Sequence, residues 1–487
     1  MDDKVTGTLH TKNEDDTHTN KCLSPDPTNS WEDESPIAPA AQRLVSYSIP
    51  APNLSPALFM QEAQGMERFF WQDAQDGIIF AGFGAAANLF AWGAGRIASI
   101  QEQAKALFET AVILNSDHQV AHANPLAAPR LFGGFSFRED YAPDNAWASF
   151  HPAHFILPHY QLVQHGDGSW LTINALIPID ETPSDSVPML KEALALRYHA
   201  LQAATLTATP PITPAEQRYP MAFPAWEQML GGAIDEIENG RLQKVVLSRV
   251  SELRFDKRVN IDGAMAYLGD QYADCYRFLF EPRPHHAFFG ATPELLAKVN
   301  GRTIHTMALA GSIERGATDH DDDLLGSQLI DSPKDRHEHD LVVTSILERL
   351  ALLTSQLEIA PQPGLYKLSN IQHLYSPVRG TLLRGDGILP IIKVLHPTPA
   401  LGGSPRRKAM SYIREAESVP RGWYGAPVGW IDVNLDGAFA VGIRSAVAQE
   451  KRVWLYAGAG IVADSEPEKE WDETGLKFMP ILNAFGV

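Results

Sequence analysis

The spacing of hydrophobic residues between positions 40 and 205 alternates between strand-like and helix-like segments. An apolar run at Ile78–Gly82 predicts a buried strand, and apolar residues three and four apart in Ile97–Leu114 predict an amphipathic helix. Two strand-like runs, His154–Gln164 and Trp170–Ile177, flank a Gly-Asp-Gly-Ser turn and therefore predict a hairpin. Pro188–Ala204 has helical spacing.

A proline-rich stretch, Thr207–Pro220, is the best candidate for a linker between two halves of the chain. Beyond it, strands neighbour strands as often as helices, so a mixed α+β fold fits better than a regular βαβ repeat. The helices expected here are Pro224–Asn239, Gly263–Asp270, Leu324–Leu353, Ala409–Ala416 and Pro467–Leu482. The strands expected here are Lys244–Val250, Arg277–Glu281, Ala287–Gly290, Val428–Val433, Ala438–Ala448 and Val453–Ala457.

The distribution of charge predicts a different kind of segment at the N-terminus. The 487 residues carry a net charge of −19, and residues 1–36, with nine acids and three lysines, contribute −6 of it. Few apolar residues occur in residues 1–36, so we expect a disordered acidic tail. We expect residues 37–210 and 211–487 to form one integrated domain, with the catalytic part in the second range. So negative a chain argues against nucleic acid and anionic membranes as partners.

The cysteines and the lengths of the apolar runs indicate the cellular compartment of the protein. Cys22 and Cys275 make no disulfide framework, and no run of about 18 apolar residues could span a membrane. We therefore expect a cytoplasmic protein.

A short glycine motif follows the strand predicted at Ile78–Gly82. Gly82–Ala87 satisfies the GxGxxA pattern of dinucleotide sites, with Glu102 about 20 residues further on. Gly93 and Gly95 interrupt the helix that such a site needs, and no βαβ series follows. We therefore favour a tight turn after the strand, with small residues for close packing.

Two pairs of carboxylates are the strongest chemical signal. Asp335 and Glu338 stand three residues apart at the start of a helical pattern, and Glu470 and Glu473 repeat that spacing in the last helix. Four carboxylates brought together would need a cation, and oxygen ligands favour Mg²⁺. Alternatively, the acids only complement the dipoles of two helix starts. Both interpretations stay open at this point.

Two further features suit a small anionic ligand, and a third residue, Lys244, is a candidate base. Ala457–Ile461 follows a predicted strand and could turn free backbone N–H groups toward an anion. Arg444 lies in an otherwise apolar strand, where it either binds an anion or forms an internal salt bridge. Lys244 heads a strand, where partial desolvation would make it a candidate base; the alternative is a solvated lysine that protects a sheet edge.

Taken together, these segments resemble the chorismate-utilising enzymes, which include isochorismate synthases, salicylate synthases and anthranilate synthase large subunits. The resemblance is strong over residues 215–487 and loose over residues 40–210. It implies an α+β fold like that of anthranilate synthase component I, with two large antiparallel sheets packed as a sandwich and flanking helices. The motifs that carry it are Lys244–Arg249, Ala291–Leu296, Ala308–Ser312, Lys334–His339, Leu395–Gly403, Gly425–Trp430, Gly442–Ala446, Ala457–Ile461 and Glu470–Thr474.

The resemblance implies roles for these residues. Lys244 matches the lysine that activates water for attack at C2 of chorismate, and Glu294 matches the acid that protonates the departing C4 hydroxyl. Glu338 and Glu473 match Mg²⁺ ligands, with Asp335 and Glu470 contacting the metal through water. Several relatives have Glu at the position of Asp335, whose side chain is shorter. The positions matching substrate contacts are Arg444 and Tyr424 for the enolpyruvyl carboxylate, Gly458, Gly460 and Lys477 for the ring carboxylate, and Gly311, Ser312, His373, Ala400 and Leu401 for the pocket wall.

Within the family, Lys244 indicates water as the nucleophile, because the ammonia-using members resemble each other in having Gln there. Leu309–Ser312 has no lysine where one type of aminodeoxychorismate synthase has a nucleophilic one. Salicylate synthases carry Thr in place of Ala400. The resemblance therefore implies an Mg²⁺-dependent isochorismate synthase, acting on chorismate as a monomer without an amidotransferase subunit. The alternatives are a salicylate synthase and, from another class, a non-catalytic scaffold that binds divalent ions.

Overall fold

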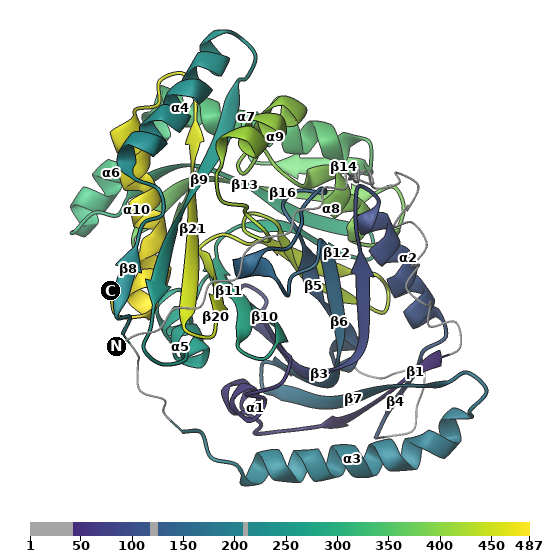
Figure 1. Cartoon of the computed structure of the whole chain (residues 1–487). Coiled ribbons are helices and arrows are strands. Elements are labelled where there is room, and N and C mark those ends of the chain that lie inside the picture. The colour runs from purple at the N-terminus through teal and green to yellow at the C-terminus, as the bar shows by residue number, and fades with distance from the viewer. Residues whose placement is uncertain (1–41, 117–124, 208–212) are drawn as a thin grey trace, which may run out of the picture. The chain divides into compact units, whose positions relative to one another are not determined.

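The computed structural model describes residues 42–116, 125–207 and 213–487 (Figure 1). The acidic tail expected at residues 1–36 lies outside these residues. The described residues belong to a single compact unit. In the part of the chain that the structure describes, no helix is both long enough and apolar enough to cross a membrane.

The strand that carries Lys244, the expected base, lies near one end of a long sheet. Its strands are hydrogen-bonded antiparallel to one another, except for the parallel pair at the far edge. At this end of the sheet, two short strands pair with the same edge of β9 (Lys244–Arg254). They are β8 (Glu216–Arg218), which lies in the proline-rich stretch, and β17 (Gly403–Ser404). From there the order is β9 (Lys244–Arg254), β21 (Arg452–Ile461), β20 (Ser445–Gln449), β11 (His286–Thr292), β10 (Tyr276–Arg283), β2 (Arg68–Asp73), β3 (Ile78–Ala91), β6 (Ala153–His165), β7 (Gly168–Pro178), β1 (Gln42–Pro50) and β4 (Val112–Asn115).

A second set of strands branches from β6. The first residues of β6 pair with β5, and its last residues pair with β7. The two sheets expected from the sequence are therefore joined through β6 into one continuous network, and the α+β prediction is confirmed. From β6 the second order is β5 (Arg130–Phe135), β18 (Pro427–Asp432), β19 (Gly437–Val441), β12 (Leu295–Asn300), β13 (Thr303–Glu314) and β16 (Ile371–Leu382), with β14 (Thr354–Ile359) and β15 (Gly364–Lys367) along the outer edge of β16.

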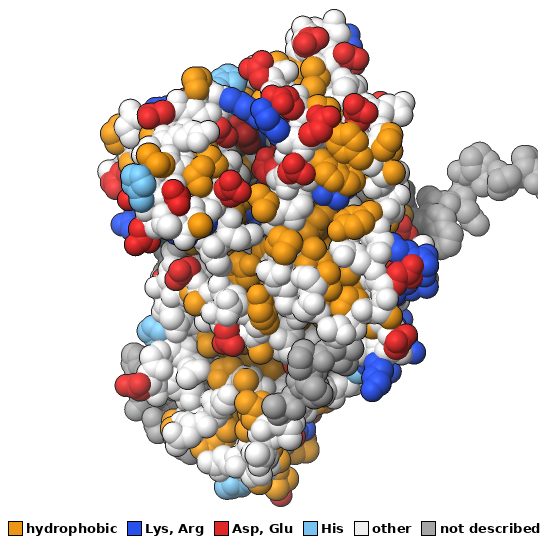
Figure 2. All heavy atoms as spheres, turned by 90° about the vertical axis from the view of Figure 1, so that its left-hand side faces the viewer, with side chains coloured by type: hydrophobic (Ala, Val, Ile, Leu, Met, Phe, Trp, Pro, Cys, Tyr) orange, Lys and Arg blue, Asp and Glu red, His pale blue; other side chains and the backbone are white. Residues whose placement is uncertain are grey.

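Helices cover the outside of the strands. Figure 1 shows α10 and α4 beside β9 and β21, α7 and α9 above them, and α3 along β7 and β1. Figure 2, which faces the left-hand side of Figure 1, shows many Asp and Glu side chains over the upper part of that face. The helices are α1 (Pro56–Glu62), α2 (Arg96–Glu109), α3 (Pro183–Ala203), α4 (Phe223–Glu238), α5 (Ile261–Gln271), α6 (Asp319–Asp331), α7 (Pro333–Ala351), α8 (Leu389–Leu395), α9 (Arg406–Ala416) and α10 (Pro467–Ala484).

One predicted helix is two helices. The pattern over Leu324–Leu353 is divided at Ser332, which ends α6 and caps the start of α7. The Ser332 hydroxyl accepts a hydrogen bond from the N–H of Asp335 at 3.3 Å, and Pro333 occupies the first position of α7. Proline is favoured at that position because its missing N–H has no partner there anyway. The break starts a new helix just before Asp335 and Glu338.

Two predictions at the glycine-rich motifs are wrong. Gly82–Ala87 lies inside β3, so there is neither a dinucleotide-binding turn nor a tight turn after a short strand. The added side chain of an alanine at Gly82 would lie 2.5 Å from Pro158, which explains the small residue. Ala457–Ile461 lies inside β21 rather than after a strand. Both strands contain glycine because neighbouring atoms approach the backbone too closely for a larger residue.

The strand predicted over Ala438–Ala448 is also interrupted. β19 ends at Val441 and β20 begins at Ser445, so Arg444 lies between two strands rather than within one. Its φ of 48° places a non-glycine residue in the left-handed region, which costs conformational free energy. That backbone turn gives Arg444 a direction that neither flanking strand would impose.

Candidate active site

The two predicted carboxylate pairs lie on helix starts that contact one another. Asp335 and Glu338 occupy the first turns of α7, and Glu470 and Glu473 occupy the first turns of α10. Lys334 on α7 joins the helices, because its Nζ lies 3.1 Å from Oε1 of Glu470. The fold therefore brings together two acidic pairs that are more than 130 residues apart in the chain.

Three of these four carboxylates are paired with lysines. Nζ of Lys244 lies 2.7 Å from Oε1 of Glu338, and Nζ of Lys477 lies 2.5 Å from Oε1 of Glu473. Lys334 holds Glu470, and the Ser332 hydroxyl hydrogen-bonds to Asp335. Within the described ranges, no three acidic, histidine or cysteine side chains converge as metal ligands would. The residues are thus neighbours, while the predicted metal coordination stays a prediction.

The carboxyl groups of this cluster have shifted pKa values. Burial, together with the charge of Glu473, raises the pKa of Glu470 to about 7. Burial also opposes ionisation of Glu473, yet the ammonium group of Lys477 outweighs it and lowers the pKa of Glu473 to about 2. Burial raises the pKa of Asp335, and the charge of Glu338 adds to that shift. Lysines in this cluster therefore compensate charge that a bound cation would otherwise compensate.

Lys244 is fully buried at the start of β9. β17 covers one edge of that strand and β21 the other, so Lys244 does not act as a solvated lysine at a sheet edge. Gly460 faces it on β21. A Cβ atom at Gly460 would lie 2.8 Å from Oε1 of Glu338 and 2.9 Å from Cε of Lys244, closer than real Cβ contacts come. Glycine at this position therefore makes room for the ion pair.

The backbone of β21 directs two N–H groups away from β9. In the register of β21 and β9, Gly458 is opposite Ser248 and Gly460 is opposite Val246. The N–H of Val246 donates to the carbonyl of Gly402, and the N–H of Ser248 donates to Glu417, both on the side away from β21. These are therefore non-hydrogen-bonded pairs, so the N–H groups of Gly458 and Gly460 point away from β9. Lys477 Nζ donates to the Gly458 carbonyl at 2.9 Å on that same side.

Glu294 provides a second buried titratable group. It follows β11, and its residue is 4% exposed. Burial raises its pKa to about 7, although the charges of Lys244, Arg444 and Lys477 oppose the shift. Among the described residues, its carboxyl group has no hydrogen-bonding partner. A carboxyl group in this state can hold a proton near neutral pH and donate it.

A chain of polar side chains leads from Ser312 to Arg444. Nη2 of Arg444 lies 3.3 Å from Nε2 of His373, and Nδ1 of His373 lies 2.9 Å from the Ser312 hydroxyl. Burial and the charge of Arg444 lower the pKa of His373 to about 3, so its ring is neutral. Arginine can only donate, so Nε2 accepts and Nδ1 carries the proton. Nδ1 also lies 3.3 Å from the carbonyl of Gly311.

The remaining predicted residues line the same region. Tyr424 is buried and stacks on Tyr456, with ring centroids 5.3 Å apart. Burial raises the pKa of Tyr424 to about 12. Ala400 and Leu401 lie in the turn before β17, where Leu401 is buried and Ala400 half-buried. Gly311 lies within β13 at a shift in its pairing with β16 and has a φ of 77°; a Cβ there would lie 3.1 Å from Asp335, so this part of β13 packs closely on α7.

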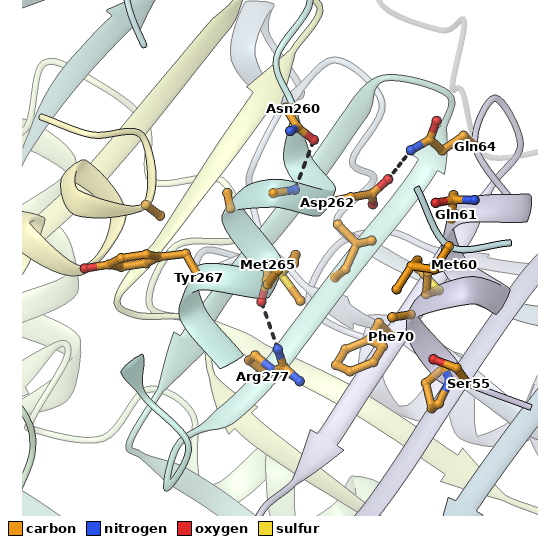
Figure 3. Close-up of a pocket in the computed structure, with 18 of the residues that line it drawn as sticks. Ser55, Met60, Gln61, Gln64, Phe70, Asn260, Asp262, Met265, Tyr267 and Arg277 are labelled. Carbon is orange, nitrogen blue, oxygen red and sulfur yellow. Dashed lines mark hydrogen bonds between the residues drawn. The ribbon is translucent and has the colours of Figure 1, made fainter. Parts of the chain in front are cut away.

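Two cavities differ in their relation to these residues. A cavity of about 620 Å³ is lined by Lys334, Gln243 and Val462, the direct chain neighbours of Asp335, Lys244 and Ile461. A cavity of about 790 Å³ lies between α1 and α5 and contains none of the predicted residues. Figure 3 shows that its polar groups already have partners: Asp262 accepts from Gln64, and Arg277 donates to the Met265 carbonyl. The site therefore lies beside the smaller cavity.

A family model described as "Chorismate binding enzyme" matches residues 34–486. The chain belongs to this family. Isochorismate synthase MenF of Bacillus subtilis is 34% identical over 91% of this chain and 93% of its own length. A salicylate biosynthesis isochorismate synthase of Pseudomonas aeruginosa is 36% identical over 85% of this chain and 84% of its own length.

Solved structures of chorismate-binding enzymes have the same fold. The menaquinone-specific isochorismate synthase MenF of Escherichia coli matches 91% of this chain and 95% of its own, with a TM-score of 0.75 and 25% identity. Anthranilate synthase component I of Streptococcus pneumoniae matches 97% of this chain and 100% of its own, with a TM-score of 0.65 and 19% identity. The latter supports the fold alone, which agrees with the architecture predicted from the motifs.

Sequence reasoning missed several polar partners in the site. Lys334 stands in a recognised motif but had no assigned role, and Ser465, which donates to Glu470 at 2.8 Å, was not singled out. Glu417 and Arg421 were also missed, although their spacing of four residues is typical of an ion pair. A lysine next to an acidic pair is the one local signal that could have indicated the link between α7 and α10.

Proposed function

We propose that this chorismate-binding enzyme is an isochorismate synthase, which interconverts chorismate and isochorismate. The observation that carries the proposal is that Lys244 and Glu294 are both buried in one site, where the charge of Lys244 acts on the Glu294 carboxyl group. One amine and one carboxyl group suffice for a reaction that adds water at one ring carbon and removes hydroxyl from another. The names of the Bacillus and Pseudomonas relatives support the same activity.

In the proposed step, Lys244 takes a proton from water while the water oxygen forms a bond to C2 of chorismate. The ring double bonds shift, the bond between C4 and its hydroxyl oxygen breaks, and Glu294 gives that oxygen a proton. Water is consumed and released in equal amounts, so the substrate is isomerised. Because Lys244 donates to Glu338 as an ammonium group in the present geometry, it must first lose a proton and turn its Nζ toward the water before it can act as a base.

Charge complementarity supports binding of a dicarboxylate. Arg444 is buried without a carboxylate partner within the described ranges and, with Tyr424, would hold the enolpyruvyl carboxylate. The N–H groups of Gly458 and Gly460, which point away from β9, would bind the ring carboxylate together with Lys477. Cations and backbone donors in a buried site interact strongly with such groups because water competes little there. Gly311, Ser312, His373, Ala400 and Leu401 would form the walls around the ring.

Mg²⁺ is the cofactor that the donor set fits. Asp335, Glu338, Glu470 and Glu473 offer only carboxylate oxygens, which is the chemistry that this ion selects. Glu338 and Glu473 would hold it directly, with Asp335 and Glu470 contacting it through water. When bound, Mg²⁺ would supply positive charge for the ring carboxylate. Lys334 and Lys477 also compensate part of the acidic charge, through their ion pairs with Glu470 and Glu473.

The experiment that tests this function is product identification. The purified chain is incubated with chorismate and Mg²⁺, and early products are separated by chromatography. Isochorismate as the main early product supports the proposal. Salicylate with pyruvate would instead indicate a salicylate synthase, and anthranilate formed with ammonia would contradict water as the nucleophile. Because water is the proposed nucleophile, no amidotransferase subunit is required in the assay.

A further inference from the structure

A buried ion pair outside the expected catalytic set connects two walls of the site. Glu417 directly follows α9, and Arg421 lies four residues further on; their side chains are only 5% and 3% exposed. Nη2 of Arg421 lies 2.5 Å from Oε1 of Glu417, and Nε lies 2.9 Å from Oε2. This two-point contact fixes the guanidinium plane, which a single contact would leave free to rotate.

The remaining donors and acceptors of the pair reach other segments. Nη2 of Arg421 donates to the carbonyl of Val246 at 2.7 Å, and Nη1 donates to the carbonyl of Leu401 at 2.8 Å. Oε1 of Glu417 accepts from the N–H of Ser248 at 2.8 Å. The pair therefore binds both β9 and the turn before β17. The Arg421 guanidinium also lies 4.3 Å over the ring of Phe137, which closes it from water.

These two segments carry the expected base and part of the pocket wall. Lys244 begins β9, and Ala400 and Leu401 lie in the turn. β17 has only two residues, and backbone hydrogen bonds from Val246 to Gly402 and from Gln243 to Ser404 join this segment to β9. The charge-assisted bonds of Arg421 and Glu417 add a second connection between the turn and β9. A small change in their geometry would alter the distance between Lys244 and the wall beside Leu401.

We propose that Glu417 and Arg421 are positioning residues that set the distance between the base and the pocket wall. They contact neither substrate nor metal in this account; they act through β9 and the Leu401 turn. The proposal rests on the proposed isochorismate synthase function, since it concerns the base of that reaction. Misplacement of a reacting group by about 1 Å can lower a rate about 100-fold.

The test compares Arg421→Gln, Arg421→Lys and Glu417→Gln with Arg241→Gln. Arg241 makes a similar two-point pair with Glu236, but that pair is solvent-exposed and touches neither segment. For Arg421→Gln we expect kcat/KM to fall about 100-fold, mostly through kcat, and for Arg421→Lys about tenfold. Arg241→Gln should stay within twofold of the wild type. Hydrogen exchange of peptides covering residues 244–250 and 396–404 should accelerate in Arg421→Gln and Glu417→Gln but not in Arg241→Gln.

The outcomes separate this proposal from the proposed function. Folded Arg421→Gln with kcat/KM within threefold of the wild type would overturn it, as would faster exchange without loss of rate. If Arg421→Gln does not fold, Arg421→Lys decides: a fivefold or larger loss at an unchanged melting temperature supports the proposal, and no loss overturns it. If the wild type forms no isochorismate, the proposed function fails, while unchanged exchange in the variants would overturn the positioning role by itself.

Discussion

Nζ of Lys244 lies 2.7 Å from Oε1 of Glu338, so the expected base is hydrogen-bonded to an expected metal ligand. The contact joins β9 to α7 across 94 residues of sequence. A cation at Glu338 and the ammonium group of Lys244 would compete for the same carboxylate oxygen. The two functions of the site, metal binding and proton transfer, are therefore linked through this one contact.

Removal of the base tests the role of Lys244. We expect Lys244→Ala to lower kcat by about 10²–10⁴-fold, the usual contribution of a positioned acid or base. Circular dichroism should show that the variant remains folded. Lys469→Ala is the matched control, because Lys469 is an exposed lysine at the start of α10 that forms an ion pair with Glu466 on the surface. Wild-type turnover in Lys244→Ala would remove this residue as the base.

The pH dependence tests the role of Glu294. Because burial raises its pKa to about 7, its protonated form is lost as pH rises through 7. We therefore expect kcat for isochorismate formation to decline above pH 7. Glu294→Gln should lose about 10²–10⁴-fold in kcat and show no decline at that pH. A wild-type pH profile that is flat between pH 6 and 8 would contradict Glu294 as the acid.

The raised pKa of Glu294 also predicts how stability depends on pH. A carboxyl pKa that is higher in the folded than in the unfolded state means that the folded protein binds more protons between about pH 4.5 and 7. Stability then falls as pH rises through that window. Glu294→Gln, which cannot ionise, should be more stable than the wild type at pH 8 by about 3 kcal/mol and equal to it near pH 4. Denaturant unfolding at both pH values measures this difference.

Some of these features follow from local pattern and others do not. The hairpin at β6 and β7 and the acidic helix starts were predictable, because turn residues and helical spacing are local signals. The break at Arg444 was not, since the surrounding apolar residues fit one continuous strand; only tertiary contacts hold its φ of 48°. Nor could spacing show that Gly458 and Gly460 lie within β21, because strand register depends on a partner 200 residues away.

Loss of a metal ligand should appear in Mg²⁺ binding. We expect Glu473→Gln to weaken Mg²⁺ binding at least tenfold, because one of two direct carboxylate ligands is lost. Calorimetric titration with MgCl₂ measures it without turnover. Asp472→Asn is the matched control, since Asp472 is an exposed neighbour outside the acidic cluster. An unchanged Mg²⁺ titration for Glu473→Gln would exclude it as a ligand.

The close approach at Gly460 gives a steric test. A Cβ at this position would lie 2.8 Å from Glu338 and 2.9 Å from Lys244, so Gly460→Ala should displace the ion pair and lower kcat/KM at least tenfold. Gly475→Ala is the control in α10, where a Cβ has only one neighbour, at 3.9 Å. That change should leave activity intact and raise stability by about 0.5–1 kcal/mol, because alanine favours the helix. Equal activity in both variants would contradict the packing described for Gly460.

Isotope labelling tests most directly whether a water molecule becomes the new hydroxyl, as water activation by Lys244 requires. Chorismate is converted in ¹⁸O-labelled water with Mg²⁺ present, and isochorismate isolated at low conversion is analysed by mass spectrometry. If water attacks C2, we expect isochorismate that carries one ¹⁸O atom, in its C2 hydroxyl, while unreacted chorismate stays unlabelled. Unlabelled isochorismate would show that the hydroxyl migrates within the substrate, and this result would contradict the account.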